Sequence, residues 1–304
     1  MLKLSGTIEL PKHIQTGGFD HADIHPARRL FYVAHTCNNA LDVIDCNAGR
    51  YSHSVPDLAG VAGALVSGDK VFTSNRGENT VGIFPASDES QLVKVPVGLR
   101  PNGLAFDPGR NLLLAANVGN PDIPNSFTLS MVNLTRTEMV HSIPVPGRTR
   151  WAIFDPQTDS FYINIADPSV IVAVKANDPG RISQTFPIPA AGPHGLDLDT
   201  DHHRLFCACD AGRLVTVGLP DGGIASESAL SGKPDVIFFH PGHQRLYVAV
   251  GDPGVIDVFD TETMTRIESV ETGKGAHTFV LDKAHNILYV FLPQNHSAAV
   301  FVDN

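Results

Sequence analysis

The sequence is poor in cysteine, tryptophan and methionine, and it contains no long apolar run. Its 304 residues include four cysteines, one tryptophan and four methionines. No two cysteines are spaced as Cys-x-x-Cys, and nothing in their pattern requires disulfides. No stretch approaches the roughly 18 consecutive apolar residues of a membrane-spanning helix, so we expect no membrane segment.

Positive charges are also few. The chain has 22 lysines and arginines against 32 aspartates and glutamates, a formal charge of −10. This balance disfavours a nucleic-acid backbone or an anionic membrane surface as the main partner. The first residues lack the long apolar core of a secretion signal, which predicts a cytoplasmic protein, or a periplasmic one if a signal has been removed. We expect a monomer.

Several common catalytic motifs are missing. The sequence has no Gly-Lys-Ser/Thr phosphate loop, no Gly-x-Ser-x-Gly elbow and no Gly-x-Gly-x-x-Gly. Nothing local therefore supports nucleotide binding or Ser/His/Asp nucleophilic catalysis. Cys207 and Cys209 lie two apart in a predicted strand and share one of its faces. They could be a pair of zinc ligands, but a pair of small buried residues is favoured.

What the sequence does contain is a repeat of strand, tight turn and strand, clearest from Gly192 to Asp210. Equivalent positions are separated by 48, 44, 41 and 42 residues, and they are Asn102, Arg150, His194, Asp235 and His277. Units of roughly 40–45 residues with four short strands each are typical of β-propellers. We therefore predict a single all-β domain over residues 1–304, a seven-bladed β-propeller with four-stranded blades.

The two ends of the chain complete this prediction. Residues 2–10 form a predicted strand with no partner nearby in the sequence, whereas the seventh blade stops after three strands. The N-terminal strand can supply the missing fourth strand. This pairing would remove an open sheet edge and close the ring.

The repeat resembles the YVTN-type propeller repeat. The resemblance is carried by Leu246–Val250 with Val255–Asp260, and by Phe31–His35 with Leu41–Asp45. It covers nearly the whole chain, but its motif is structural. Propellers of this kind include lactonase-like hydrolases and streptogramin lyase, which implies hydrolase or lyase chemistry assisted by a divalent metal and a histidine base. The functional residues of these families cannot be matched one by one to this sequence, so the resemblance does not fix a function.

Propeller geometry predicts where a site would lie. The start of each first strand and the end of each second strand open on one face of the disc, and together they surround a central funnel. The first-strand ring consists of Asp20 or His21, Ala62, Asn102, Arg150, His194, Asp235 and His277. The second-strand ring consists of His35, Asn75 or Arg76, Asn117, Asp167, Asp210, Asp252 and Gln294.

Histidines in these rings suggest a metal site. His21, His194 and His277 come from three different blades and, with Asp235, form a predicted nitrogen and oxygen site for a divalent metal ion. His194 and His277 are also candidates for proton transfer, and His35 is a fourth histidine or a general base.

Other ring residues are candidates for binding a substrate. Arg150 could hold a carboxylate or phosphate, with Trp151 as a stacking wall. The amides of Asn75, Asn102 and Asn117 would add hydrogen bonds. The expected ligand is a small polar or anionic molecule.

Structural roles compete with each of these interpretations. Polar ring residues can cap the loops of their own blade, and Trp151 can fill the space between blades four and five. Repeated aspartates at turns are predicted to bind nearby backbone amides: Asp45, Asp107, Asp155, Asp199, Asp260 and Asp282. Histidines at turns on the opposite face are predicted to be solvated: His25, His202, His203, His240, His243 and His285.

Two functions follow. The first is an enzyme acting on a small molecule in the funnel, a lactonase-type hydrolase or a lyase assisted by a divalent metal. The second is a propeller that binds a ligand or a protein without turnover. The insertion at Gly119–Asn125 lies on the funnel face and favours the first, whereas the lack of a long lid loop favours the second.

Overall fold

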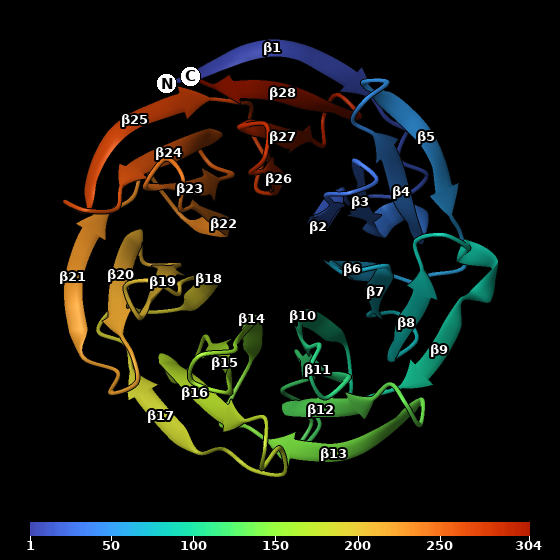
Figure 1. Ribbon diagram of the computed structural model, residues 1–304, viewed down its shortest axis with the longest axis vertical. Helices are drawn as coiled ribbons and strands as arrows, with labels where there is room; N and C mark the ends of the chain where they lie inside the picture. Colours follow the sequence, from blue (N-terminus) through green and yellow to red (C-terminus); the bar gives the residue numbers. More distant parts are fainter.

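The computed structural model describes all 304 residues and confirms the seven-bladed propeller (Figure 1). Seven antiparallel sheets of four strands each surround one axis, and only two short 3₁₀ helices interrupt the strands. These helices are η1 (Thr36–Asn38) and η2 (Glu89–Gln91). None of the helices has the length and apolar character needed to cross a membrane.

The strands follow the chain from blade to blade, each blade running from the axis outward. Blades one and two contain β2 (Phe19–His25), β3 (Leu30–His35), β4 (Ala40–Asp45), β5 (Arg50–Val55), β6 (Val61–Ser67), β7 (Lys70–Asn75), β8 (Thr80–Pro85) and β9 (Val93–Pro96). Blades three and four contain β10 (Pro101–Asp107), β11 (Leu112–Asn117), β12 (Thr128–Asn133), β13 (Glu138–Pro144), β14 (Thr149–Asp155), β15 (Ser160–Ile165), β16 (Val170–Lys175) and β17 (Gln184–Pro187).

The remaining blades continue in the same order. Blades five and six contain β18 (Pro193–Asp199), β19 (Arg204–Cys209), β20 (Arg213–Gly218), β21 (Ile224–Ala229), β22 (Pro234–His240), β23 (Arg245–Val250), β24 (Val255–Asp260) and β25 (Thr265–Glu271). Blade seven contains β26 (Phe279–Asp282), β27 (Ile287–Leu292), β28 (Ser297–Asp303) and β1 (Leu2–Glu9). Its first strand is shorter than the repeat predicts, since Gly275–Thr278 is not a strand.

The inner strands are apolar because both of their faces are covered. Every residue of β11 is buried between the neighbouring blades, whereas the outer strand β25 exposes most of its residues. Each apolar cluster of the core lies between adjacent blades, such as the one that joins Ala105 and Leu114 of blade three to Ala152 and Ile163 of blade four. Since every blade packs on two neighbours, the core is continuous around the ring.

The N-terminal strand closes the ring as predicted. β1 pairs antiparallel with β28, from Leu2 opposite Asp303 to Glu9 opposite Ser297, and the two chain ends lie side by side (Figure 1). The buried carboxylate of Asp303 accepts hydrogen bonds from Arg245 and Tyr247 of blade six. The closing sheet is therefore tied to its neighbour by side chains as well as by backbone.

The turns are mostly as predicted, with two corrections. Asp107 accepts a hydrogen bond from the backbone of Gly109 at 2.8 Å, and Asp45 does the same for Asn47 at 2.8 Å. The carboxylate of Asp282 accepts hydrogen bonds from the side chains of His285 and Arg29 and not from a backbone amide. Two of the turn histidines, however, are not solvated: His25 and His240 are buried. The His240 ring stacks on the ring of His243 at 4.5 Å, and its Nε2 lies 2.9 Å from Asn286 Oδ1, which explains its burial.

Candidate functional site

β-Bulges build the funnel. The pairing of the first strand with the second is interrupted in blades one to six, and the residues skipped include the member of the first-strand ring in each of these blades. A bulge leaves one or two residues out of the ladder and turns their side chains away from the alternating pleat. The sequence left open whether Asp20 or His21 occupies the first-strand ring in blade one. Both residues lie in the bulge of that blade, so both belong to the ring.

Glycines allow these bulges to approach the next blade. A Cβ atom on Gly103 would lie 2.4 Å from the carbonyl oxygen of Arg150, and one on Gly195 would lie 2.3 Å from that of Asp235. No real Cβ atom tolerates such distances. The glycine that follows Asn102 and His194 is thus required by the close packing of first strands around the axis.

A network of charged side chains lies at the centre of the site. His194 Nδ1 lies 2.7 Å from Asp210 Oδ1, and His194 Nε2 lies 3.1 Å from Asp235 Oδ1. Arg150 reaches the same pair, with Nη1 3.2 Å from His194 Nε2 and Nη2 3.4 Å from Asp210 Oδ2. Lys233 Nζ also lies 3.3 Å from Asp210 Oδ2. Residues from blades four, five and six therefore meet here.

This network sets the protonation of its members. Burial opposes the charged form of His194, but Asp235 and Asp210 outweigh it and raise the pKa of His194 to about 9. Burial also opposes the charge of Asp235, yet His194 and His277 hold its pKa well below the usual range. At neutral pH His194 is accordingly an imidazolium between two carboxylates, and it can donate a proton but not accept one.

His277 has the opposite character. Its Nδ1 lies 2.7 Å from the backbone carbonyl of Gly275, which can only accept, so Nδ1 carries the proton. Its Nε2 is the free nitrogen and lies 3.9 Å from Asp235 Oδ2. The side chain is 36% exposed, the most open of the funnel histidines. His277 can therefore accept a proton from a bound molecule or water.

Arginines gather at the mouth of the funnel. The pKa of Arg148 is lowered by burial and by the nearby charges of Arg150, Arg100 and Arg76. Arg76 pairs with Asp20 at 3.3 Å and Arg150 pairs with Asp210. Arg100 and Arg148 make no ion pair within the chain. Arg100 and Arg148 are therefore the unpaired positive charges of this group, whereas Asp20 and Asp210 offset the charges of the other two arginines.

Six buried polar atoms of the two funnel rings have no hydrogen-bond partner. They are Asn75 Oδ1, Arg76 Nε, Asn102 Oδ1, Asn117 Oδ1, Arg150 Nε and Asp235 Oδ1. Asp235 Oδ1 is within ion-pair distance of His194, but the angle is not that of a hydrogen bond. Buried polar groups are normally satisfied by protein, water or ligand, so the unsatisfied ones concentrated here give this part of the molecule unused hydrogen-bonding capacity.

Trp151 closes the channel beneath this network. Its indole lies 4.2 Å from the ring of His21 and 6.2 Å from that of Phe238, measured between centroids. Blades one and four lie on opposite sides of the ring, so the contact of His21 with Trp151 crosses the channel (Figure 1). Beyond it lies a cavity of about 250 Å³ that is also lined by Asp23 and Asp197. Trp151 packs on the core of blades four and five as well.

The predicted metal ligands are only partly assembled. His194, Asp235 and His277 are neighbours, but the ligand atoms of no three of the four predicted residues come within 4.8 Å of one another. His21 is turned to Trp151, and burial lowers the pKa of its ring. Both nitrogens of His194 are occupied by Asp210, Asp235 and Arg150. Metal binding at this place would require Arg150 to move away.

The asparagines of the second-strand ring have structural contacts. Asn75 and Asn117 are fully buried, and the Nδ2 of each donates to a threonine of the next strand, Thr80 at 3.0 Å and Thr128 at 2.9 Å. Their predicted role in substrate binding therefore does not fit their burial. Asn102 lies in a bulge and is 7% exposed, and like Asn75 and Asn117 it has an unpaired Oδ1.

His35 also lies away from the funnel network. It is fully buried, and its Nδ1 lies 2.7 Å from Asp42 Oδ2 while its Nε2 lies 2.7 Å from His13 Nδ1. Because His35 Nε2 faces His13, His35 has no nitrogen directed at a ligand in the funnel.

Sequence reasoning missed several residues of the site. Arg148 and Lys233 each lie two residues before a ring position, Arg150 and Asp235 respectively. Residues at this offset enter the first strand on the funnel face, so extending the ring by two residues would have included both. Arg76 enters the predicted second-strand ring only as an alternative to Asn75. His13 lies outside every repeat unit, so no periodic signal could have found it.

Comparisons with known proteins support the fold. No family model matches this chain, and no curated protein matches it in sequence. Among solved structures it is similar to the hydrazine synthase of Kuenenia stuttgartiensis, with a TM-score of 0.82 and 14% identity over 96% of this chain and 98% of that chain. Such a likeness shows the propeller fold alone. Membership of the YVTN-type or lactonase-like group stays a prediction.

Proposed function

We propose that this protein binds a small anionic molecule, a carboxylate or phosphate compound, at the mouth of its funnel. The observation that carries the proposal is the group of four arginines, two of which have no carboxylate partner. Guanidinium groups bind carboxylates and phosphates through paired hydrogen bonds. The imidazolium of His194 and the ammonium of Lys233 add positive charge beside them.

The depth of the funnel limits the ligand. Trp151 and His21 close the channel, so a bound molecule would rest on the indole while its anionic group faces Arg100 and Arg148. The unpaired Arg150 Nε and Asn102 Oδ1 would provide one donor and one acceptor below the mouth. We infer a ligand with one anionic end and a smaller polar or apolar end.

Calorimetric titration with phosphate, succinate and citrate tests this proposal. We expect at least one of them to bind, with an affinity that falls as ionic strength rises. Arg100→Ala with Arg148→Ala should weaken that binding at least tenfold. Arg136→Ala is the matched control, because Arg136 pairs with Glu138 on an exposed outer strand. Binding of none of the three anions, or equal affinity in all variants, would overturn the proposal.

A second candidate is catalysis on the same ligand, of the lactone-hydrolase or lyase type. It is favoured by the pairing of an acid and a base: His194 carries a proton at neutral pH, and His277 has a free Nε2. Arg150 and His194 would polarise a carbonyl group, and His277 would take a proton from water or from the substrate. A divalent metal could assist only if Arg150 were displaced.

A screen of lactones and of carboxylate substrates for elimination, each with and without Mg²⁺, Mn²⁺ or Zn²⁺, tests this candidate. We expect His277→Ala to lower kcat by roughly two orders of magnitude with little change in anion affinity. Elemental analysis of wild type and of the His194→Ala, His277→Ala double variant tests metal assistance. Turnover that is unchanged in the double variant would exclude the two histidines as catalysts.

A further inference from the structure

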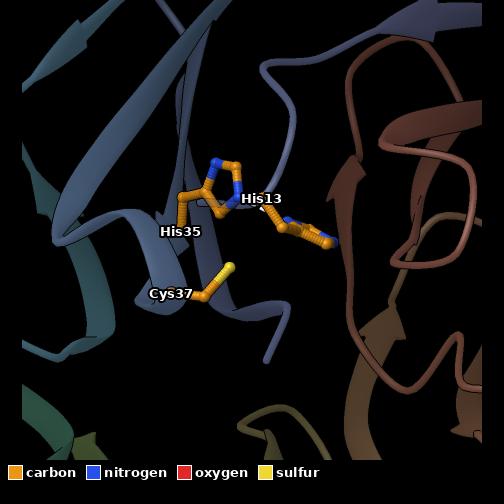
Figure 2. Close-up of side chains that lie close together, drawn as sticks. All are labelled: His13, His35 and Cys37. Atoms are coloured by element: carbon orange, nitrogen blue, oxygen red, sulfur yellow. Dashed lines mark hydrogen bonds between the residues drawn. The ribbon is translucent and has the colours of Figure 1, made fainter. Parts of the chain in front are cut away.

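His13, His35 and Cys37 bring three metal-binding atoms together outside the funnel network (Figure 2). One ring nitrogen from each histidine and the Cys37 sulfur all lie within 4.8 Å of one another, and this is the chain's single group of three or more such ligands. His35 ends β3, Cys37 lies in η1, and His13 belongs to the segment between β1 and β2. His35 and Cys37 are buried, and His13 covers them from the solvent side.

Each histidine has one nitrogen that points away from the other ring, called its outer nitrogen here. Both outer nitrogens, His35 Nδ1 and His13 Nε2, face groups that can only accept a hydrogen bond. His35 Nδ1 lies 2.7 Å from the Asp42 carboxylate, and His13 Nε2 lies 2.7 Å from the backbone carbonyl of Pro293. Each outer nitrogen must therefore carry a hydrogen. Two neutral rings then direct the lone pairs of His35 Nε2 and His13 Nδ1 at each other across 2.7 Å.

Two lone pairs at this distance repel unless a cation lies between them. The cation is either a third proton or a metal ion. The Cys37 sulfur, which lies close to both nitrogens, favours the metal ion over the proton. A proton shared by the two rings is not stabilised by a nearby thiol, whereas a soft metal ion would gain the sulfur as a third ligand.

The surroundings of His35 are those of a metal ligand. Asp42 is fully buried, and its second oxygen accepts a hydrogen bond from Ser54 Oγ at 2.6 Å. A carboxylate that holds the far nitrogen of a histidine fixes the tautomer and the direction of the ring, and this arrangement is common behind histidines that bind metal ions. The positions of His35 and of its Nε2 lone pair are thus fixed in advance.

We propose that His13, His35 and Cys37 form a binding site for a thiophilic transition-metal ion, Zn²⁺ or Cu⁺. Ligand bonds of about 2.0–2.1 Å to nitrogen and tetrahedral geometry require the two nitrogens to be roughly 3.3 Å apart. The His13 ring must therefore withdraw by about half an ångström. His13 lies on an exposed segment and can move in this way, and a water molecule would complete a four-coordinate zinc ion.

The site would join two parts of the chain that meet only in the closed ring. His13 lies in the segment that follows β1, the strand that completes blade seven, whereas His35 and Cys37 belong to blade one. The segment is already held there, since Ile14 N donates to Asn38 Oδ1 at 2.9 Å and Asn38 Nδ2 donates to the Lys12 carbonyl at 3.0 Å. A bound ion would add a link across the closure, and it should stabilise the folded protein accordingly.

Metal binding to the chelator-treated full chain tests the proposal. We expect wild type to bind one equivalent of Zn²⁺, or of Cu⁺ under anaerobic reducing conditions, and to melt at a higher temperature when loaded. Co²⁺ should give the absorption of a thiolate-to-metal transition. Cys37→Ser and His13→Ala should each weaken metal binding at least tenfold. Cys37→Ser should also remove the thiolate-to-metal absorption of the Co²⁺ form.

Cys46→Ser is the matched control, because Cys46 is partly buried in blade one but lies outside the cluster. It should bind as wild type does. His13→Ala alters a half-buried residue, so it keeps the test valid if Cys37→Ser does not fold. Failure of wild type to bind either ion stoichiometrically, or undiminished binding in both folded variants, would overturn the proposal and leave a shared proton between the rings. Neither result bears on anion binding at the funnel mouth.

Discussion

Arg150 Nη1 lies 3.2 Å from His194 Nε2, although both groups are positively charged at neutral pH. Their repulsion is offset by Asp210, which lies 2.7 Å from His194 Nδ1 and 3.4 Å from Arg150 Nη2, and by Asp235 beside His194 Nε2. Two cations are thus held side by side by two carboxylates. The arrangement leaves Arg150 Nε without a hydrogen-bond partner.

Stability should depend on His194 in alkaline solution. Its pKa is about 9 in the folded protein and about 6.5 in an unfolded chain, so its contribution is complete below pH 6.5 and is lost as the pH rises through 9. We expect the unfolding free energy of wild type to fall by about 3 kcal/mol over this range through His194. Denaturant unfolding at pH 6 and pH 9.5 should show this loss in wild type but not in His194→Gln. His203→Gln, which changes a histidine in an exposed turn, should behave as wild type. The same change in unfolding free energy between pH 6 and pH 9.5 in all three proteins would contradict the prediction.

Asp23 should act in a lower pH range. Burial raises the pKa of Asp23 to about 6, despite hydrogen bonds from the backbone of Val66 and Ile24. A raised carboxyl pKa favours the folded state at low pH and costs stability as the pH rises from about 4 to 6. Because Asp23 keeps some exposure to the channel, we expect a cost of about 2 kcal/mol, below the roughly 3 kcal/mol that the pKa difference implies. Asp23→Asn should not show this cost. Between pH 4 and pH 7, the unfolding free energy of wild type should therefore fall by about 2 kcal/mol more than that of Asp23→Asn.

The closing strand should contribute strongly to stability. Ile8 of β1 is 4% exposed and packs in the core between blades seven and one, whereas Leu4 of the same strand is 64% exposed. We expect Ile8→Ala to lower the unfolding free energy by about 2–4 kcal/mol and Leu4→Ala to change it by less than about 0.5 kcal/mol. Removal of residues 1–10 should cost more than Ile8→Ala, because it also exposes the edge of β28. Thermal and denaturant unfolding would measure all three, and a similar effect of the two point variants would refute the assigned register.

Gly195 should tolerate no side chain. The Cβ of alanine would lie 2.3 Å from the Asp235 carbonyl oxygen, and backbone cannot retreat as a flexible side chain can. We expect Gly195→Ala to destabilise the protein by about 2 kcal/mol or more and to disturb the contact of His194 with Asp235. Gly223→Ala is the control, since nothing lies within 4 Å of its added atom. A change in the pH dependence of unfolding in Gly195→Ala, but not in Gly223→Ala, would confirm that the alanine disturbs the contact of His194 with Asp235 as well as lowering stability. An unchanged pH dependence in Gly195→Ala would contradict this.

The fold could be predicted because each blade repeats the same local pattern of strands and turns. Strand periodicity, turn residues and the spacing of ring positions such as His194 and Asp235 are all visible in the sequence. The ring could also be located, because a propeller fixes which ends of the strands share a face.

The chemistry of the site could not be predicted with the same accuracy. The sequence places Asn117 in the ring but does not show that its amide turns inward to Thr128. It places His194 and Asp235 together but does not show that Arg150 occupies the space a metal would need. His13 depends on the path of a segment outside the repeat. Side-chain direction and non-repeating segments are set by packing, which periodicity does not report.

The bulges of the first strands have a further consequence for how such a protein can change. A residue in a bulge is outside the ladder, so its replacement alters neither the strand register nor the alternation of buried faces. Blade two shows this, since Ala62 occupies the same place as Arg150 and His194 do in their own blades. The lining of the funnel can therefore be altered one position at a time while the strand register is inherited unchanged, so new binding residues can arise on a scaffold whose sheets are already in place.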